Sequence, residues 1–232
     1  MTNGTLPANR VAIVVGAGGE LGRATAVNLA DRGMTVVAVD RSGPGLDRLP
    51  AGIARELVDA TDPNAAVPML ERVVRDVGPP DTLVNTIGAF QIGTALSTTP
   101  ELLRLMIDVN LGPALWLSQA VAPHMQRLGA GAIVHITARP GIEPSAGIAA
   151  YSASKAALVH LTRILDLELR PLGIRVNSVA PQLLDTPTAR ASFAEEALLH
   201  AVTPEAIAEV VAFLVSEAAA PISGAILPAY GP

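Results

Sequence analysis

A glycine-rich turn near the amino end limits the folds open to this chain more than any other feature. The apolar run Val11–Val15 continues directly into Gly16-Ala17-Gly18-Gly19-Glu20-Leu21-Gly22, and an alanine-rich helical pattern follows. Glycines here permit a tight turn and a close approach of the backbone to a pyrophosphate, while the helix start directs free N–H groups at that anion. The order strand, turn, helix therefore indicates the first βα unit of a dinucleotide-binding parallel sheet.

The rest of the chain repeats this alternation of short apolar runs and helical patterns. We expect strands at Val11–Val15, Thr35–Val39, Arg55–Val58, Thr82–Val84, Ala132–Thr137, Ile174–Val179 and Ala225–Leu227. Helices are expected at Glu20–Arg32, Asn64–Val77, Pro100–Asn110, Leu111–Leu128, Ala149–Arg170 and Pro204–Ser216. Several runs are apolar on consecutive residues, as is typical of parallel strands covered on both faces. The sequence predicts an α/β fold, a single Rossmann-like doubly wound domain over residues 1–232 with a mostly parallel seven-stranded sheet and helices on both faces.

One long segment, Gln182–Val202, has no clear strand pattern. It contains Pro187 and a possible short helix around Ala194–His200. Long connections without strands in compact domains often cover a functional site. We therefore expect residues 182–202 to form a lid over the substrate within the single domain.

Composition and charge restrict the partners. The net charge of −5 argues against nucleic acid and anionic membranes, and no apolar run is long enough to span a bilayer. The chain has no cysteine, its four histidines show no metal-ligand spacing, and Met1–Arg10 holds no signal-like apolar run. We expect a cytoplasmic protein with a small-molecule substrate and no metal. Because only 16% of the residues are charged, we also expect a homo-oligomer, with a tetramer favoured.

The end of the second expected strand bears on the choice of dinucleotide. Asp40 lies at the position where an acidic residue can bond the adenosine ribose hydroxyls and repel a 2′-phosphate. Arg41, beside it, can instead reach a 2′-phosphate, but Ala17–Gly19 contain no basic residue that would help. NAD is therefore the expected cofactor, and NADP is the less favoured alternative.

The candidate catalytic residues are Tyr151 and Lys155. On a helix these two side chains lie one turn apart on the same face. An ammonium close to a phenol lowers the pKa of the phenol from about 10, which makes the tyrosine a usable proton donor and acceptor. Lys155 is the only lysine in the chain, whereas there are fifteen arginines. This contrast favours a chemical role over a solvated helix face.

Together these motifs resemble the short-chain dehydrogenase/reductase family over nearly the whole chain. The glycine turn, Asp40, Asp59, Asn85-Thr86-Ile87-Gly88, Asn110, Tyr151 with Lys155, and Pro181 with Thr186 fall in the family's order. The resemblance implies the following contacts. Asp59 would lie near the adenine, Asn85 near the adenosine ribose, and Thr186 near the carboxamide. Lys155 would hold the nicotinamide ribose, and Asn110 would keep a water bound to Lys155. The expected catalytic set is Tyr151, Lys155 and Asn110. The expected cofactor contacts are Gly16, Gly18, Gly19, Glu20, Leu21, Gly22, Asp40, Arg41, Asp59, Ala60, Asn85, Gly88, Tyr151, Lys155, Pro181 and Thr186.

The chain also departs from the family pattern. Glu20 replaces the middle glycine of the turn, which narrows the approach to a pyrophosphate. Gln182 stands where a glycine is common, and Pro228-Ala229-Tyr230-Gly231 replaces the usual Asp-Gly-Gly. Most consequential is Ala138, at the position of the catalytic serine, 13 residues before Tyr151.

Three solutions to the missing serine remain open. Thr137 is adjacent, but neighbouring strand residues point to opposite faces. Ser145 lies on the following loop, and the third solution is that no side chain substitutes. Alanine at this position resembles the quinonoid dihydropteridine reductase branch of the family, whose electron-poor substrate accepts hydride without a serine. His135 and Arg139 flank the expected strand end, so one of them is a candidate substrate contact.

Two functions are compatible with this pattern. The first is an NAD(H)-dependent oxidoreductase that transfers hydride between nicotinamide and a small carbonyl, hydroxyl or activated (quinonoid, conjugated) substrate, with Tyr151 exchanging the proton. The second is a non-catalytic NAD(H)-binding sensor or assembly subunit that has lost the catalytic serine. The retained Tyr151, Lys155 and Asn110 favour the enzyme.

Overall fold

A single parallel sheet organises the molecule. The computed structural model describes residues 10–231, and its strands lie in the order β3-β2-β1-β4-β5-β6-β7. Their bounds are β1 Val11–Val15, β2 Thr35–Asp40, β3 Ala54–Leu57, β4 Thr82–Asn85, β5 Gly131–Ile136, β6 Ile174–Pro181 and β7 Ile226–Ala229. All pairings are parallel, as the uninterrupted apolar runs predict.

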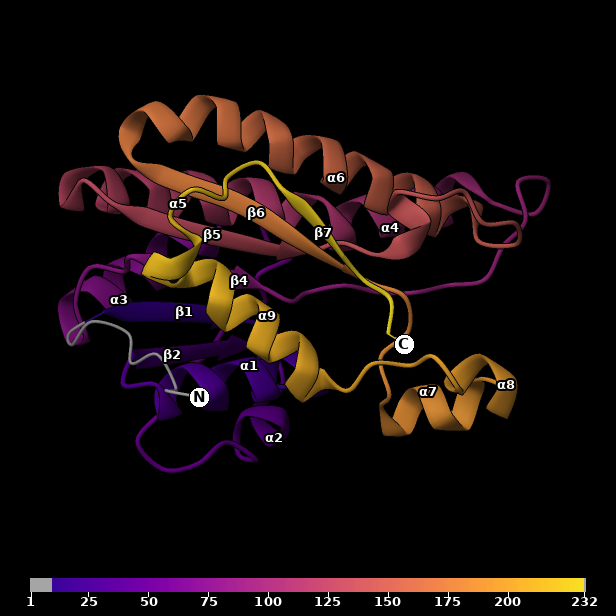
Figure 1. Ribbon diagram of the computed structural model, residues 1–232, viewed down its shortest axis with the longest axis horizontal. Coiled ribbons are helices and arrows are strands. Elements are labelled where there is room, and N and C mark those ends of the chain that lie inside the picture. The colour runs from indigo at the N-terminus through magenta and orange to yellow at the C-terminus, as the bar shows by residue number, and fades with distance from the viewer. Residues whose placement is uncertain (1–9, 232) are drawn as a thin grey trace.

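Helices cover both faces of the sheet (Figure 1). On one face lie α1 (Glu20–Asp31) and α9 (Pro204–Val215). On the other lie α3 (Ala66–Asp76), α4 (Pro100–Asn110), α5 (Gly112–Leu128) and α6 (Ala149–Leu169). This arrangement is the expected doubly wound α/β domain with helices on both faces.

The core consists of aliphatic side chains in two layers. Along β1, Ala12 and Val14 pack on the α1 and α9 side, whereas Ile13 and Val15 pack on the opposite side. The alternation follows from the two-residue period of a strand. Because aliphatic side chains fill both layers, the core needs few of the aromatic residues of this chain.

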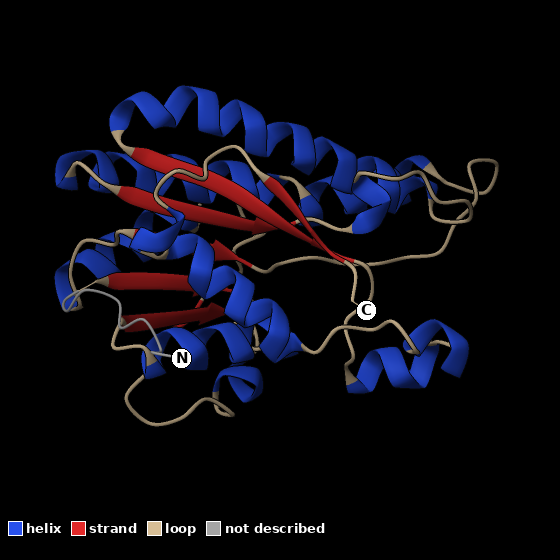
Figure 2. Ribbon diagram, viewed as in Figure 1, coloured by secondary structure: helices blue, strands red, loops and turns tan. Residues whose placement is uncertain are grey.

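Three short α-helices lie in the connections between the longer elements: α2 (Gly43–Leu46), α7 (Pro187–Ser192) and α8 (Glu195–Leu198). The expected helix at Ala194–His200 is found as α8, but α2 and α7 were missed because caps rather than apolar periodicity define them. The hydroxyl of Ser42 accepts a bond from Gly45 N at the start of α2, and that of Thr186 accepts one from Ala189 N at the start of α7. Figure 2 shows α7 and α8 set apart from the layered helices and joined to them by loops.

The sheet topology indicates where a ligand binds. From β1 the chain moves outward to β3 and then returns to β4 on the other side of β1. Ligands of open α/β sheets bind outside the carboxyl ends of the strands at such a switch point. The candidate site residues follow the carboxyl ends of β1, β4, β5 and β6, which lie at one edge of the sheet. Among residues 10–231, no helix is both long and apolar enough to cross a bilayer.

Candidate active site

The glycine turn between β1 and α1 is shaped by close packing. Gly16 has φ +86°, and a Cβ there would lie 2.6 Å from Thr86 Oγ1. A Cβ at Gly22 would overlap the carbonyl of Gly16. Gly19 is the N-cap of α1 and offers no side-chain cap, so the first N–H groups of the helix remain available to an anion. The turn therefore fits the pyrophosphate of a dinucleotide.

Glu20, the unusual residue of this turn, is paired with two arginines. Its carboxylate forms ion pairs with Arg23 and with Arg48, the latter at 2.6 Å between Nη1 and Oε1. Arg48 also donates to the carbonyl of Gly18. The hydrogen bond from Arg48, followed by that from Arg23, lowers the pKa of Glu20. The two guanidinium groups thus neutralise a carboxylate that would otherwise repel a pyrophosphate.

Asp40 packs directly against the turn. Its Oδ2 accepts a 2.9 Å bond from Gly18 N, and its Oδ1 accepts a 2.8 Å bond from Ser42 N. Each carboxylate oxygen retains lone-pair capacity for a ribose hydroxyl. Arg41 has a 72% exposed side chain and pairs with Asp59 at 3.7 Å. Hydrogen bonds from Thr61 are the main cause that lowers the pKa of Asp59, and Arg41 adds a smaller effect.

The remaining expected cofactor contacts are spread along the same edge. Asn85 ends β4 and its Oδ1 accepts a bond from Ile87 N, which shapes the turn that follows. The carbonyl of Ala60 accepts a bond from Trp116, and the side chain of Leu21 belongs to the apolar core. Pro181 is the last residue of β6, and Thr186 caps α7. The Thr186 hydroxyl still has a proton to donate.

Two of the three catalytic candidates, Lys155 and Asn110, lie together where α4, α6 and the loop after β4 converge. Lys155 is 3% exposed and donates from Nζ to the carbonyl of Ile136 at 2.9 Å. Asn110 Nδ2 donates to Ser154 Oγ at 3.0 Å, and Asn110 Oδ1 accepts from Ala89 N at 2.9 Å. A Cβ at Gly88 would lie 3.2 Å from both Asn110 Oδ1 and Lys155 Nζ. Glycine at 88 therefore leaves a space that both polar groups border.

The expected lowering of the Tyr151 pKa is wrong for this structure. Burial raises the pKa of Tyr151 to about 12 and lowers the pKa of Lys155 to about 8. The cause is the cost of desolvating a buried phenolate. At neutral pH Tyr151 is accordingly a phenol, the protonation state that a proton donor requires.

The two hydroxyl groups that the sequence offers in place of the family's serine, those of Thr137 and Ser145, lie in different surroundings. Ala138 is 4% exposed and lies two residues after the end of β5. Thr137 is buried, and its hydroxyl donates to the carbonyl of Val179 at 3.0 Å. Ser145 lies exposed on the loop before α6.

The two flanking candidates for substrate contact differ sharply. His135 is completely buried on β5, where burial lowers its pKa to about 3, so of the two candidates only Arg139 has a side chain that is open to solvent. Arg139 is partly exposed and donates to Gln182 Oε1 at 2.7 Å and Glu143 Oε2 at 2.8 Å. Its guanidinium carbon lies 4.9 Å from the ring centroid of Tyr230. Gln182 and Tyr230, two departures from the family pattern, thus both contact Arg139, the residue that follows Ala138.

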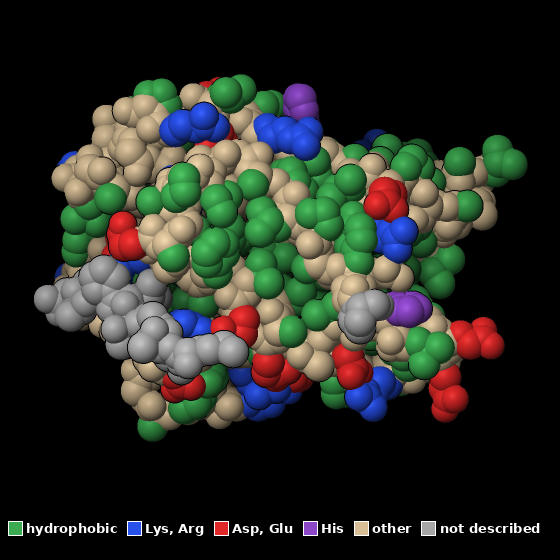
Figure 3. All heavy atoms as spheres, viewed as in Figure 1, with side chains coloured by type: hydrophobic (Ala, Val, Ile, Leu, Met, Phe, Trp, Pro, Cys, Tyr) green, Lys and Arg blue, Asp and Glu red, His purple; other side chains and the backbone are tan. Residues whose placement is uncertain are grey.

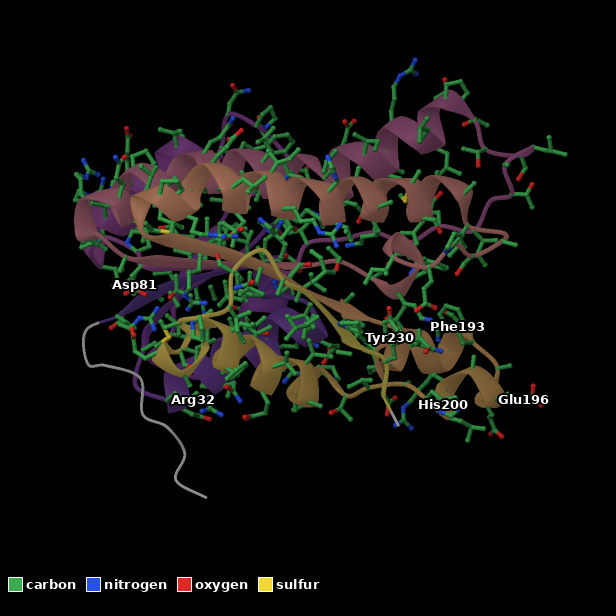
Figure 4. All side chains as sticks on the ribbon, turned by 45° about the horizontal axis from the view of Figure 1, so that its top comes forward. Arg32, Asp81, Phe193, Glu196, His200 and Tyr230 are labelled. Atoms are coloured by element: carbon green, nitrogen blue, oxygen red, sulfur yellow. The ribbon has the colours of Figure 1, made fainter. Side chains whose placement is uncertain are left out.

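Two phenylalanines near Tyr151 escaped the sequence analysis. The ring of Phe90 lies 4.9 Å from that of Tyr151 in a T-shaped arrangement. Phe193, directly after α7, lies 6.0 Å from Phe90 between ring centroids. Figure 4 shows Phe193 and Tyr230 at the same end of the molecule, opposite Arg32 and Asp81. No spacing links these residues in the sequence, and only the scarcity of aromatic residues could have drawn attention to them.

Comparison with known proteins shows which family this chain and its fold belong to. The sequence model of the family described as short chain dehydrogenase matches residues 10–197. Meso-2,3-butanediol dehydrogenase of Serratia marcescens is 33% identical over 236 residues, which cover 96% of this chain and 94% of that protein. L-xylulose reductase of Cavia porcellus is 34% identical over 238 residues, with 97% and 96% covered. The ligand-free aldohexose dehydrogenase of Thermoplasma acidophilum superposes with a TM-score of 0.86 at 29% identity, with 95% of this chain and 92% of that chain covered.

Fold and comparisons together define an oxidoreductase of the α/β class that uses a nicotinamide dinucleotide. The chain belongs to the short-chain dehydrogenase family. Within residues 10–231 no group of three or more acidic or histidine side chains is arranged to hold a metal ion.

Proposed function

We propose that this protein is an NAD(H)-dependent oxidoreductase that uses Tyr151 to exchange a proton with a small carbonyl or hydroxyl substrate. The observation that carries the proposal is that Lys155 Nζ and Asn110 Oδ1 border the same space at Gly88, with Tyr151 one helical turn before Lys155 on α6. The relatives named for butanediol and xylulose support a small oxygenated substrate.

The chemistry divides between the cofactor and the chain. When bound, the cofactor supplies hydride to the substrate carbon, or removes it, at its nicotinamide ring. In reduction, Tyr151 donates its Oη proton to the carbonyl oxygen as that oxygen gains negative charge, and in oxidation the tyrosinate takes the proton back. Lys155, one helical turn after Tyr151 on α6, holds the nicotinamide ribose.

The alanine at 138 bears on the substrate. One hydrogen-bond donor to a developing oxyanion contributes on the order of 10²–10³ in rate. The Thr137 hydroxyl already donates to the Val179 carbonyl, and Ser145 lies on the exposed loop before α6, so we take neither as the donor. We therefore assign this enzyme an activated substrate, conjugated or quinonoid, which spreads the negative charge over its own π system.

Asp40 and Arg41 support a preference for NAD(H). The carboxylate of Asp40 lies against Gly18, where its charge opposes a 2′-phosphate. Arg41 is drawn toward Asp59 at 3.7 Å, and Arg48 is engaged by Glu20, so both cations already have acidic partners.

One titration and one assay test this function. Nicotinamide fluorescence should show tighter binding of NADH than of NADPH, whereas equal or reversed affinities would contradict the role of Asp40. NADH consumption should then occur with vicinal diketones or quinones. Tight NADH binding without turnover of any diketone, quinone, ketone or dihydropterin would instead favour a non-catalytic NAD(H)-binding sensor.

We also propose a homotetramer in the cytoplasm. Large apolar side chains are exposed on α4, α5 and α6, namely Leu103, Leu105, Leu115, Ile164 and Leu167. Figure 3 shows further apolar side chains across the face on which β7 and α9 lie. Such surfaces are buried when subunits associate. Light scattering that gives a mass near 24 kDa would contradict this assembly.

A further inference from the structure

The aromatic residues of this chain are distributed unevenly. The chain has only six: three phenylalanines, two tyrosines and one tryptophan. Trp116 packs toward Ala60, and Phe213 lies exposed on α9. The other four lie at or beside the candidate active site: Phe90, Tyr151, Phe193 and Tyr230. The core, which is built from aliphatic residues, does not account for this concentration.

Phe90 is held in a fixed relation to Tyr151. Its neighbour Ala89 bonds to Asn110 through both N and O. Three residues after Phe90, Gly93 N donates to the Gly147 carbonyl at 2.8 Å, and Ala149 N donates to the Gly93 carbonyl at 2.9 Å. The loop after β4 is thereby attached to the start of the helix that carries Tyr151.

Phe193 reaches Phe90 from a different part of the chain. The segment 182–202 is closed at its base, where Asp185 N donates to the Val202 carbonyl at 2.9 Å and Val202 N donates to the Leu183 carbonyl at 2.8 Å. From this base, α7 carries Phe193 to within 6.0 Å of Phe90 between ring centroids. Even with both neighbours in contact, the Phe90 side chain remains 44% exposed. Apolar ring surface is therefore available beside the proton donor.

We propose that Phe90 and Phe193 are specificity-determining residues that bind a flat, conjugated ring attached to the reacting carbonyl group. This inference rests on the proposed function, because it requires the substrate oxygen to face Tyr151. Aromatic rings attract one another in T-shaped or offset geometries at centroid distances of about 4.5–7 Å, the range in which these rings already lie. An aryl ketone or diketone also delocalises the negative charge that develops on its oxygen. This property matches the activated substrate that we infer independently from Ala138, which supplies no hydrogen-bond donor.

Two diketones that differ in one group provide the test. 1-Phenyl-1,2-propanedione and 2,3-butanedione share the same reacting group, but only the first carries a ring. The wild type should have a kcat/KM at least about tenfold higher for the phenyl compound, and Phe193→Leu should reduce this ratio by about tenfold. Phe193→Tyr, which keeps the ring, should restore the ratio, and Phe213→Leu on α9 is the matched control that leaves it unchanged.

A binding measurement separates this proposal from the proposed function. 2-Naphthol has a flat ring but no carbonyl group that accepts hydride, so its calorimetric affinity for the NAD⁺-loaded protein does not depend on turnover. Phe193→Leu and Phe90→Leu should each weaken this binding about tenfold, whereas Phe213→Leu should not. Unchanged naphthol affinity, or an unchanged ratio for the two diketones, would show that the phenylalanines only fasten the segment 182–202 and would overturn the proposal. Naphthol binding without turnover of any carbonyl compound would contradict the proposed function alone.

Discussion

The two ends of the site differ in how the chain accommodates an unusual residue. At the cofactor end, Glu20 brings a negative charge to a turn suited to an anion, and Arg23 and Arg48 neutralise it. At the catalytic end, Ala138 removes a hydroxyl group, and the nearby Thr137 hydroxyl remains bonded to the Val179 carbonyl.

This difference has a physical origin. A carboxylate beside a bound pyrophosphate weakens binding in every catalytic cycle, so a compensating cation is needed within the protein. A buried alanine leaves no unpaired polar atom behind, and the fold needs no compensation. The loss appears only when charge develops on the reacting oxygen. At the cofactor end, the protein itself compensates for the charge of Glu20 through Arg23 and Arg48. At the catalytic end, we expect the substrate to compensate for the hydroxyl group that Ala138 lacks.

The largest expected effect tests whether the catalytic end works through Tyr151. Tyr151→Phe keeps the ring but cannot move a proton, so kcat should fall by about 10²–10⁴. NADH affinity, measured by fluorescence titration, should change little. Tyr230→Phe is the control at the other tyrosine, and an equal loss of kcat there would contradict the assignment of the proton donor.

The next effect tests compensation by the substrate. Ala138→Ser should raise kcat/KM for an unactivated ketone such as cyclohexanone by on the order of 10-fold to 10²-fold, because a donor to the oxyanion is restored. The gain for a conjugated diketone should be several-fold smaller, and Ala138→Gly serves as a control for altered packing. Equal gains in kcat/KM for both substrates would show that the conjugated substrate does not compensate for Ala138.

A smaller effect tests compensation at the cofactor end. Arg48→Ala leaves Glu20 with Arg23 as its remaining ion-pair partner, so NADH should bind about tenfold more weakly. Glu20→Gln in the same chain should recover most of the affinity, because the charge that Arg48 balances is then absent. Arg104→Ala, on exposed α4, is the matched arginine control. A loss in Arg48→Ala that Glu20→Gln does not relieve would contradict the neutralising role.

A stability measurement sharpens the comparison further, because only the catalytic end holds a buried cation. Burial lowers the pKa of Lys155 from 10.5 to about 8. Lys155→Met should therefore raise the free energy of unfolding at pH 7 by on the order of 2 kcal/mol, while it abolishes turnover. Between pH 8 and 10.5 the unfolded wild type binds more protons than the folded one, so its stability rises and the difference between the proteins shrinks. Denaturant unfolding at pH 7 and pH 10 measures both quantities, and a difference independent of pH would contradict this explanation.

The sequence predicted the fold well because the period of apolar residues and the glycine turn are local features. Tyr151 and Lys155 were likewise recognisable from one helical turn. The partners of Glu20 were not predictable, since Arg48 approaches from the connection after β2. Phe90 and Phe193 were missed for the same reason, since two loops bring them together. The sign of the Tyr151 pKa shift depended on burial, which helical spacing does not reveal.

The most direct test of the central claim concerns Ser145, the exposed hydroxyl nearest in sequence to the site. If no side chain replaces the missing serine, Ser145→Ala should leave kcat/KM for a conjugated diketone within about twofold of the wild type. Because the residue is exposed, the substitution should not disturb folding. A loss of tenfold or more in kcat with unchanged NADH affinity would show that Ser145 supplies the donor, and compensation would then lie in the protein at both ends.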